Sequence, residues 1–580
     1  MSAPGNVSPV HSQKPSETTF PEKVATVVCT GSSSQNDDRE YPTLEEEYTL
    51  RRVPGKVRWT AYTIAFVELC ERFSYYGTTA VFVNFIQQPL PEGSNTGAGF
   101  SGQSGALGMG QRASTGLTTF NTFWCYLMPI LGAWVADEFW GRMKTIQVAI
   151  AFAMVGHVIL IVSALPPVIS HPQGAIGCFS IGLVVFGVGV GGFKSNIAPL
   201  IAEQHKETRM LIKTIPETGE RVIVDPNQTI TRIFLYFYFM INVGALVGSI
   251  AMVYAEKYVG FWLAFLLPTI MFCFCPAVLF ACRKKYELTP PTGSVAAKAL
   301  KLWSLALKTR WSWNPVQFVK NCQSPDFWSS VKPSNIQNKP DWMTFDDEWV
   351  DEVRRAVKAC AVFLWYPVYW LAYGQMTNNL TSQSATLALH GVPNDIINNL
   401  DPLALIIFIP IMDQFIYPGF RKIGFNFTPL KKISTGYLVA SAAMVSAAVI
   451  QYYIYQTSPC GDHPSECKKG NSPINVWVQT VPYVLIAFSE IFTSVTGYEY
   501  AYTKAPKNMK SLVQSIFLFT NAISAAIQQG LTALSADPLL IWNYGFVAVL
   551  AQEDELNNIE ASTYLGHQPP VSNEKLDLEK

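Results

Sequence analysis

The segment ELCERFSYYG, residues 68–77, carries three ionisable side chains within an otherwise apolar stretch. Glu68 and Arg72 are four residues apart and Glu68 and Glu71 are three apart, so all three share one face of a helix. A charged side chain at the centre of a membrane helix costs about 2.5–3.5 kcal/mol, so this face must meet protein or water and not lipid. One arginine cannot neutralise two glutamates, which favours a proton-carrying carboxyl group. The alternative is a Glu–Arg pair that only joins helices.

Two more ionisable residues lie within apolar stretches of the sequence. Lys194 follows the glycine-rich run GVGVGG, which allows close helix packing, although its side chain could instead reach the membrane edge. Glu490 lies among apolar residues in IAFSEIF, and a carboxylate inside a membrane is a functional hypothesis by default. With Arg72 and Lys194 at one end and Glu490 at the other, a cavity would suit a zwitterion, with its carboxylate at the first end and its ammonium group at the second. Asn242 could donate hydrogen bonds there or join helices.

The elements that would position these residues are membrane-spanning helices. Only 14% of the residues are charged, against about 25% in soluble proteins, and apolar stretches of roughly 20 residues recur along the chain. A last stretch, near 539–551, has about 13 apolar residues where spanning needs about 17. The sequence predicts an all-α membrane protein with twelve spans, arranged as two six-helix bundles around a central cavity, with the last helix truncated. The eleven full stretches lie near residues 56–87, 116–136, 144–166, 175–199, 233–254, 259–282, 356–376, 401–418, 433–455, 475–497 and 512–533.

Basic residues indicate how the chain is oriented. They cluster in the loops after every second span, which places those loops and both termini in the cytosol. Cys460 and Cys467 lie in a loop predicted to face outside, where a disulfide can form. A formal net charge of zero gives no indication of a nucleic-acid partner. The expected divisions are a disordered tail over 1–52, bundles over 53–282 and 356–552, a cytosolic loop over 283–355 and a second tail over 553–580.

Five ordered motifs resemble one family. ELCERFSYYG fits the E-x-x-E-R-F-x-Y-Y-G motif of proton-dependent oligopeptide transporters, in the major facilitator superfamily. PILGAWVADEFWGRMKTI, GVGVGGFKSN, FYFMINVGAL and EIFTSVTGYEYAYTKAPKNMKS resemble further signatures of that family, and the last is similar to its fungal form. The resemblance covers roughly residues 55–550. It implies a monomeric symporter, embedded in plasma-membrane lipid, that imports di- and tripeptides with protons by alternating access and needs no cofactor.

The resemblance also implies roles for single residues. Proton coupling falls to Glu68, Glu71 and Arg72, with Glu71 as the leading protonation site. Lys194 would bind the peptide carboxylate and Glu490 its amino terminus. The residues implied to contact substrate are Arg72, Tyr75, Tyr76, Tyr126, Lys194, Asn242, Gln375 and Glu490, and those implied to act in gating are Asp137, Arg142 and Lys194.

Two positions depart from the family pattern. Bacterial members carry a glutamate in span 7 that pairs with the span 4 lysine, whereas this chain has Gly374 followed by Gln375. Asp401 stands where many members have asparagine. The ion pair expected for Lys194 in bacterial members is therefore missing from this sequence.

Three other functions compete with peptide symport. Transport of nitrate or another small anion is disfavoured because Glu490 would repel an anion. A receptor that binds peptide without transporting it would share the same site. An enzyme is disfavoured because the sequence shows no metal cluster and no nucleophile–histidine arrangement among its seven His.

Overall fold

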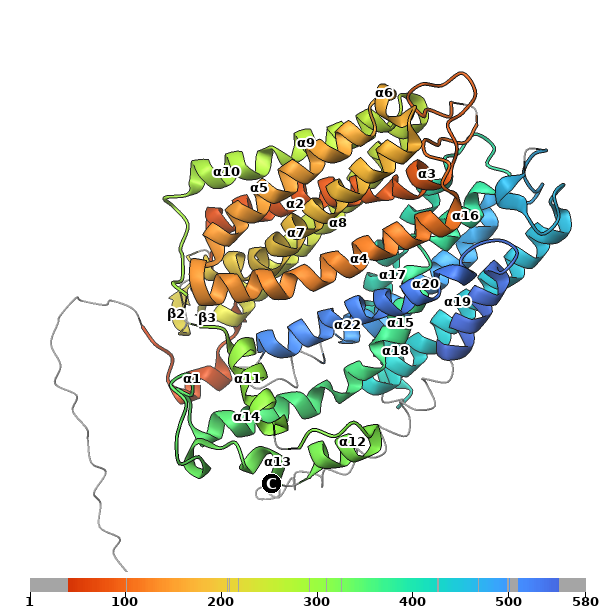
Figure 1. Cartoon of the computed structure of the whole chain (residues 1–580). Coiled ribbons are helices and arrows are strands. Elements are labelled where there is room, and N and C mark those ends of the chain that lie inside the picture. The colour runs from red at the N-terminus through yellow and green to blue at the C-terminus, as the bar shows by residue number, and fades with distance from the viewer. Residues whose placement is uncertain are drawn as a thin grey trace, which may run out of the picture.

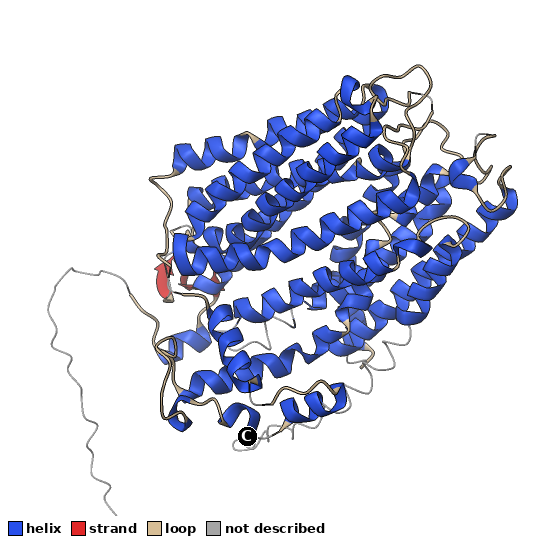
Figure 2. Ribbon diagram, in the orientation of Figure 1, coloured by secondary structure: helices blue, strands red, loops and turns tan. Residues whose placement is uncertain are grey.

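Two helical bundles make up most of the protein (Figures 1 and 2). The computed structural model describes residues 40–551, apart from 101, 206, 208, 217, 292, 309, 325, 425–426, 468, 498–499 and 501–509. The first bundle contains α2 (Trp59–Ala80), α3 (Phe82–Gln87), α4 (Gly110–Val135), α5 (Arg142–Ser163), α6 (Pro166–Ile169), α7 (Pro172–Glu203), α8 (Pro226–Tyr258), α9 (Phe261–Phe272) and α10 (Phe274–Cys282). The second contains α15 (Tyr366–Gly374), α16 (Asn379–Ala385), α17 (Leu400–Ile411), α18 (Tyr417–Lys422), α19 (Pro429–Thr457), α20 (Thr480–Glu490) and α22 (Lys510–Gly530).

The predicted spans coincide with these helices. By length and composition, 7 described helical segments are long and apolar enough to cross a membrane. Others are interrupted or carry more charge, as in α15 and α16 or in α2, so length and composition alone do not establish all twelve. The all-α architecture is as expected.

Glycines of α7 set how closely the first bundle packs. A Cβ atom on Gly189 would lie 2.3 Å from the backbone nitrogen of Ala153 in α5, and one on Gly191 would lie 2.3 Å from Cβ of Met128 in α4. Real Cβ atoms do not approach other atoms so closely, so only glycine fits at either position. The α7 helix therefore lies directly against both neighbours, and Lys194 is held beside α4.

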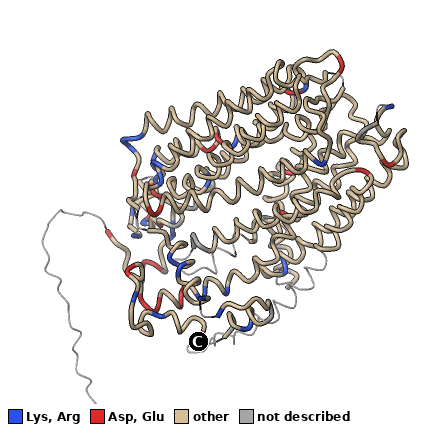
Figure 3. Tube along the Cα trace, viewed as in Figure 1, with Lys and Arg blue, Asp and Glu red and all other residues tan. Residues whose placement is uncertain are grey.

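A small sheet lies at one end of the molecule, called here the sheet end. Strands β1 (Arg52–Val53), β3 (Arg221–Val224) and β2 (Leu211–Thr214) are hydrogen-bonded in that order, with β1 parallel to β3 and β2 antiparallel to it. Figure 3 shows many charged residues gathered at this end of the backbone trace, whereas few lie along the helices.

The expectation of a disordered tail over 1–52 is wrong for residues 40–52. Helix α1 (Leu44–Thr49) begins with a capping box, in which the Thr43 hydroxyl accepts from the Glu46 amide and the Glu46 carboxylate accepts from the Thr43 amide. Arg221 of β3 forms ion pairs with Glu40 and with Glu46. Polar composition favours disorder, but partners far along the chain fold this part of the tail. Residues 1–39 lie outside the described residues.

The segment between the bundles forms a helical layer at the sheet end. It contains α11 (Val295–Leu307), α12 (Pro315–Gln323), α13 (Asp326–Ser329) and α14 (Asp347–Ala359). Leu302 of α11 and Val350 of α14 are fully buried and belong to the same hydrophobic core as the second bundle. The predicted inter-bundle loop thus contains four helices, because its apolar residues pack against the second bundle.

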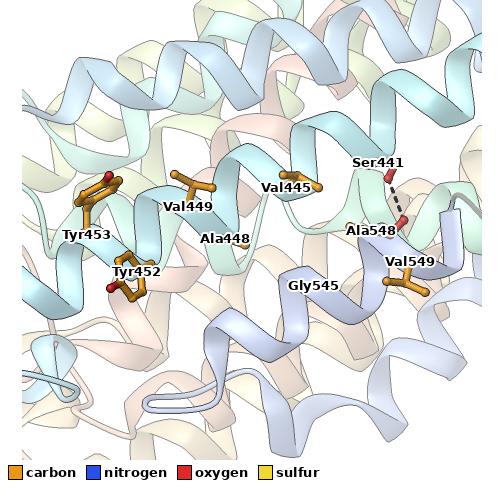
Figure 4. Close-up of a pocket in the computed structure, with 9 residues that line it drawn as sticks. All are labelled: Ser441, Val445, Ala448, Val449, Tyr452, Tyr453, Gly545, Ala548 and Val549. Atoms are coloured by element: carbon orange, nitrogen blue, oxygen red, sulfur yellow. Dashed lines mark hydrogen bonds between the residues drawn. The ribbon is translucent and has the colours of Figure 1, made fainter.

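The last described helix, Leu540–Ala551, is apolar but shorter than the helices that are long enough to cross a membrane. It packs against α19, where the Ser441 hydroxyl donates to the Ala548 carbonyl at 2.8 Å. A pocket of about 560 Å³ lies between the two helices, and Figure 4 shows the residues that line it. Its lining includes Val445, Val449 and Tyr452, which are about half exposed, and no acidic or basic side chain. Such an apolar groove on a membrane protein's surface suits lipid and not a charged substrate.

The bundles contact each other at the end opposite the sheet, called here the loop end. The Ser382 hydroxyl of α16 donates to Gln87 Oε1 of α3 at 2.5 Å. The Asn378 amide, just before α16, donates to the Thr119 hydroxyl of α4 at 3.3 Å. The structure joins Cys460 and Cys467 in a disulfide within the loop after α19.

Candidate binding site between the bundles

The ionisable face of α2 forms a compact cluster. Arg72 Nε lies 2.9 Å from Glu68 Oε1 and 2.6 Å from Glu71 Oε2. All three side chains are at most 3% exposed. Glu68 Oε1 accepts a hydrogen bond from Arg72, whereas neither oxygen of Glu71 has a hydrogen-bond partner within the described residues. Of the two acids, Glu71 is therefore the one whose carboxylate accepts no hydrogen bond from the described residues.

Lys194 adds a second positive charge beside this cluster. Its Nζ lies 3.9 Å from the centre of the Tyr126 ring, which is a cation–π contact. Among the described residues, no carboxylate oxygen lies within 4.0 Å of that nitrogen. The lysine also interacts electrostatically with Arg72 and Glu71. Because α7 continues from Lys194 to Glu203, the lysine lies within the bundle and not at the end of its helix.

Tyrosines connect the α2 cluster with the second bundle. Tyr75 and Tyr76 meet edge to face at 5.2 Å, and the Arg72 guanidinium lies 5.7 Å from the Tyr75 ring centre. Tyr76 is 41% exposed although it lies within α2, in the first bundle. Its hydroxyl interacts electrostatically with Arg72, Lys194 and Glu490, so it faces the space between the bundles.

An acidic pole lies across from these cations. Glu490 ends α20 and Asp401 lies in α17, and the two carboxylates are close enough to interact. The Tyr373 hydroxyl of α15 lies close enough to Glu490 to interact with its carboxylate. In the described part of the chain, no basic side chain contributes to the electrostatic environment of either acid. This pole is thus negative and uncompensated.

Sequence reasoning missed Tyr373 and undervalued Asp401. Tyrosines at 366, 369 and 373 follow the spacing of one helix face in YPVYWLAYG, which was the signal available for Tyr373. Asp401 stood out only as a departure from the family pattern, since nothing in the sequence places it beside Glu490.

Asn242 and Gln375 are engaged within their own bundles. The Asn242 amide donates to the Tyr238 carbonyl at 2.8 Å, one turn earlier in α8, while the Tyr238 side chain interacts with Glu490. Gln375 is 1% exposed, and its Oε1 accepts from Asn379 at 2.6 Å. The structure places Gln375 in a helix–helix network because the chain leaves the helix after Gly374.

Asp137 and Arg142, two of the three residues implied in gating, lie near the sheet end. Arg142, at the start of α5, forms an ion pair with Glu203 at the end of α7. The Asp137 carbonyl accepts from the Gly293 amide at 3.0 Å, which attaches the turn after α4 to the segment that follows α10. Both residues thus fasten helices of the first bundle.

Two bundles with opposed ionisable groups between them define a secondary transporter of the two-bundle kind. The profile of the POT family matches residues 143–546. The chain is 40% identical over 547 residues to the peptide transporter PTR_A of Candidozyma auris, covering 90% of this chain and 87% of the relative. It is 40% identical over 524 residues to the probable peptide transporter ptr2 of Schizosaccharomyces pombe, covering 90% and 81%. The chain belongs to the POT family, as its motifs indicate.

Solved structures agree on the fold. The crystal structure of the POT family transporter PepTSo matches with a TM-score of 0.68 at 20% identity, covering 89% of this chain and 100% of that one. An auto-inhibited POT family peptide transporter matches with a TM-score of 0.66 at 20% identity, covering 90% and 99%.

Proposed function

We propose that this protein is a proton-coupled symporter that imports di- and tripeptides across the plasma membrane by alternating access. The observation that carries the proposal is the opposition of charge between the bundles. Arg72 and Lys194 lie on the first bundle, and Glu490 with Asp401 lies on the second. The names of the fungal relatives as peptide transporters support the same substrate class.

The site suits both ends of a short peptide. Lys194 has no directly paired carboxylate among the described residues, so its ammonium group is available to the peptide carboxylate. Glu490 and Asp401 have no basic partner there, so they are available to the peptide ammonium group. Tyr76 and Tyr126 interact electrostatically with Glu490 from the first bundle and would line the peptide between the poles.

Proton coupling follows from competition for positive charge. A peptide carboxylate that binds near Arg72 and Lys194 takes up part of the positive charge that compensates Glu71. Glu71 then holds a proton more tightly, and by linkage a protonated Glu71 strengthens peptide binding to the same degree. Moving one net charge inward gains about 2.3 kcal/mol per 100 mV of inside-negative potential.

Alternating access requires the bundles to part at one end at a time. The hydrogen bonds between α3 and α16 and between the start of α16 and α4 close the loop end in this state. The orientation predicted from basic residues places the loop end outside. The structure would then represent the state that releases peptide towards the cytosol.

Uptake of a labelled dipeptide into liposomes that contain the purified protein tests this function. We expect an acidic exterior to raise uptake, and unlabelled di- and tripeptides to compete where tetrapeptides and nitrate do not. Competition by nitrate would indicate an anion transporter. Saturable peptide binding without accumulation would indicate a receptor.

A further inference from the structure

A second pair of buried acids lies at the loop end, apart from the binding site. Glu256 is in the last turn of α8, in the first bundle, and Asp395 is in the 3-10 helix η4 (Asn394–Asn399) of the second. They are 1% and 0% exposed. Their side chains lie within hydrogen-bonding distance of each other, so the contact joins the two bundles.

Neutral amides surround this acid pair. Asn84 Nδ2 of α3 donates to Glu256 Oε1 at 2.7 Å and to Asn394 Oδ1 at 2.9 Å. The Asn394 amide donates back to Asn84 Oδ1 at 3.0 Å, and Gln103 donates to Asn394 Oδ1 at 2.9 Å. After these bonds, Glu256 Oε2 and both Asp395 oxygens have no donor in good hydrogen-bond geometry among the described residues, although the Asn84 and Asn394 amides lie near Asp395.

No cation compensates the acid pair in the part of the chain that the structure describes. Lys257 follows Glu256 in sequence, but its Nζ donates to the Gly391 carbonyl. The Ser104 hydroxyl reaches Glu256. Tyr483 of α20 is the other titratable group near Asp395, and its hydroxyl bonds to the Met376 carbonyl at 3.1 Å and to Asn398 at 2.5 Å. The pair thus faces amides, hydroxyls and carbonyls.

We propose that Glu256 and Asp395 form a proton-binding site that closes the loop end. Two carboxylates in contact in a dry interface, without a cation, cannot both be ionised. One shared proton supplies the missing donor, because the O–H of one acid donates to an oxygen of the other. The closed interface then carries one negative charge in place of two.

The proton occupancy of this pair is linked to closure. When the bundles part, each acid meets water and can ionise alone, and closing them again requires one proton for the pair. A single-proton linkage changes the ratio of open to closed loop ends by up to about tenfold per pH unit. The role of this closure in peptide import rests on the proposed function, but the linkage itself needs no peptide.

Distance measurement between spin labels tests the linkage directly. The labels are placed at Q173C, at the start of α7, and A533C, after α22, in lipid nanodiscs without peptide. Both positions are exposed and lie at the loop end of different bundles. The full-length protein is used, with serine in place of Cys29, which lies outside the described residues, and in place of the described free cysteines that are not buried, namely Cys178, Cys273, Cys282 and Cys322. We expect the population with the longer distance to increase several-fold as the pH rises from 5 to 8.

Neutral isosteres of the acids are the decisive variants. In E256Q the amide donates permanently to Asp395, and in D395N it donates to Glu256, so each variant should stay closed at every pH. The control E92Q removes an exposed carboxylate at the same end and should keep the wild-type response. Loss of the response in either folded variant, with E92Q unchanged, supports the proposal. An unchanged response in both variants, or no response in the wild type, overturns it.

Peptide uptake by the same samples separates this proposal from the proposed function. A protein that shows the pH response but no peptide uptake would refute peptide transport and leave the proton site standing. Peptide uptake without the pH response would refute the proton site and leave peptide transport standing.

Discussion

Two of the carboxylate pairs among the described residues are almost completely buried, and only one of these two has a cation. Glu68 and Glu71 share Arg72, which lies within 2.9 Å of both, and Lys194 acts on them from α7. Glu256 and Asp395 lie against each other with amides and no basic group among their described neighbours. Both pairs are almost completely buried.

The cation decides what each pair can respond to. Beside Arg72, the protonation of an acid depends on whatever else competes for positive charge, so a bound carboxylate can control it. Without a cation, protonation depends on whether the two acids touch, so the position of the bundles controls it. A transporter needs both kinds of response, one to substrate and one to conformation.

Removing the cation from the first pair should have the largest effect. In R72Q, Glu68 and Glu71 lose their directly paired cation and keep only the influence of Lys194, and removing one partner of a buried ion pair costs about 3–5 kcal/mol of folding free energy. We expect a clearly lower melting temperature in detergent and no peptide uptake. R72K, which keeps the charge, should recover most of the stability. Wild-type stability and uptake in R72Q would show that Arg72 does not compensate these acids.

Removing one acid from the first pair should separate proton drive from peptide exchange. E71Q keeps the shape of the side chain but cannot release a proton. We expect acid-driven accumulation to fall to the level without a pH gradient, while exchange of labelled for unlabelled peptide across the membrane continues. E68Q is the matched comparison, because Glu68 is hydrogen-bonded to Arg72 and Glu71 is not. Full acid-driven accumulation by E71Q would refute its role as proton carrier.

Disturbing α7 should affect the site and spare the loop end. In G191A the new methyl group meets Met128 Cβ, which lies 2.3 Å from its ideal position. Overpacking of this kind costs about 1–3 kcal/mol and would displace α7, and Lys194 with it, from α4. We expect slower uptake with an unchanged pH response of the spin labels. G174A, at a position with no atom within 4 Å, is the control and should behave as wild type.

The smallest effect is expected at the folded part of the tail. The Thr43 amide and hydroxyl hydrogen-bond to Glu46 and hold the pKa of its carboxyl below the ordinary value, and Arg221 lowers it further. The bonds of Glu46 to Thr43 and Arg221 therefore stabilise the folded tail above about pH 4.3, the ordinary pKa of a glutamate. This stabilisation is lost as the pH falls through the lower pKa that Glu46 has in the folded state.

Hydrogen exchange of residues 40–53 measures this effect. At neutral pH we expect E46Q to exchange faster than the wild type, with uptake unchanged and E45Q as the control. Equal exchange in E46Q and the wild type would show that the capping box does not hold the tail.

The sequence predicted the helices and the central charges well, because both have local signals. Apolar stretches of spanning length located the bundles, and a charge within such a stretch, as at Glu71 or Glu490, stands out by its cost. The acid pair at the loop end has no such signal. Glu256 and Asp395 lie at helix ends, where charged residues are ordinary, and only the packing of the two bundles brings them together.

The tail and Gln375 show the same limit. Residues 40–52 look disordered by composition, and their order depends on strand pairing with residues 221–224, far along the chain. Gln375 follows the position of the family's span 7 glutamate, but the break in the helix after Gly374 turns it into a contact with Asn379. Contacts between distant segments decided both cases.

The opposition of charge between the two bundles is tested most directly by measuring two ligands on two forms of the protein. The binding constants of a dipeptide and of its N-acetylated form are measured for the wild type and for E490Q, at one pH and salt concentration. A charged hydrogen bond contributes about 1.5–3 kcal/mol, so acetylation should weaken binding to the wild type about 10- to 150-fold. In E490Q we expect acetylated and natural peptides to differ by only a few-fold. An acetylation penalty of the same size in both proteins would contradict the assignment of the acidic pole to the peptide ammonium group.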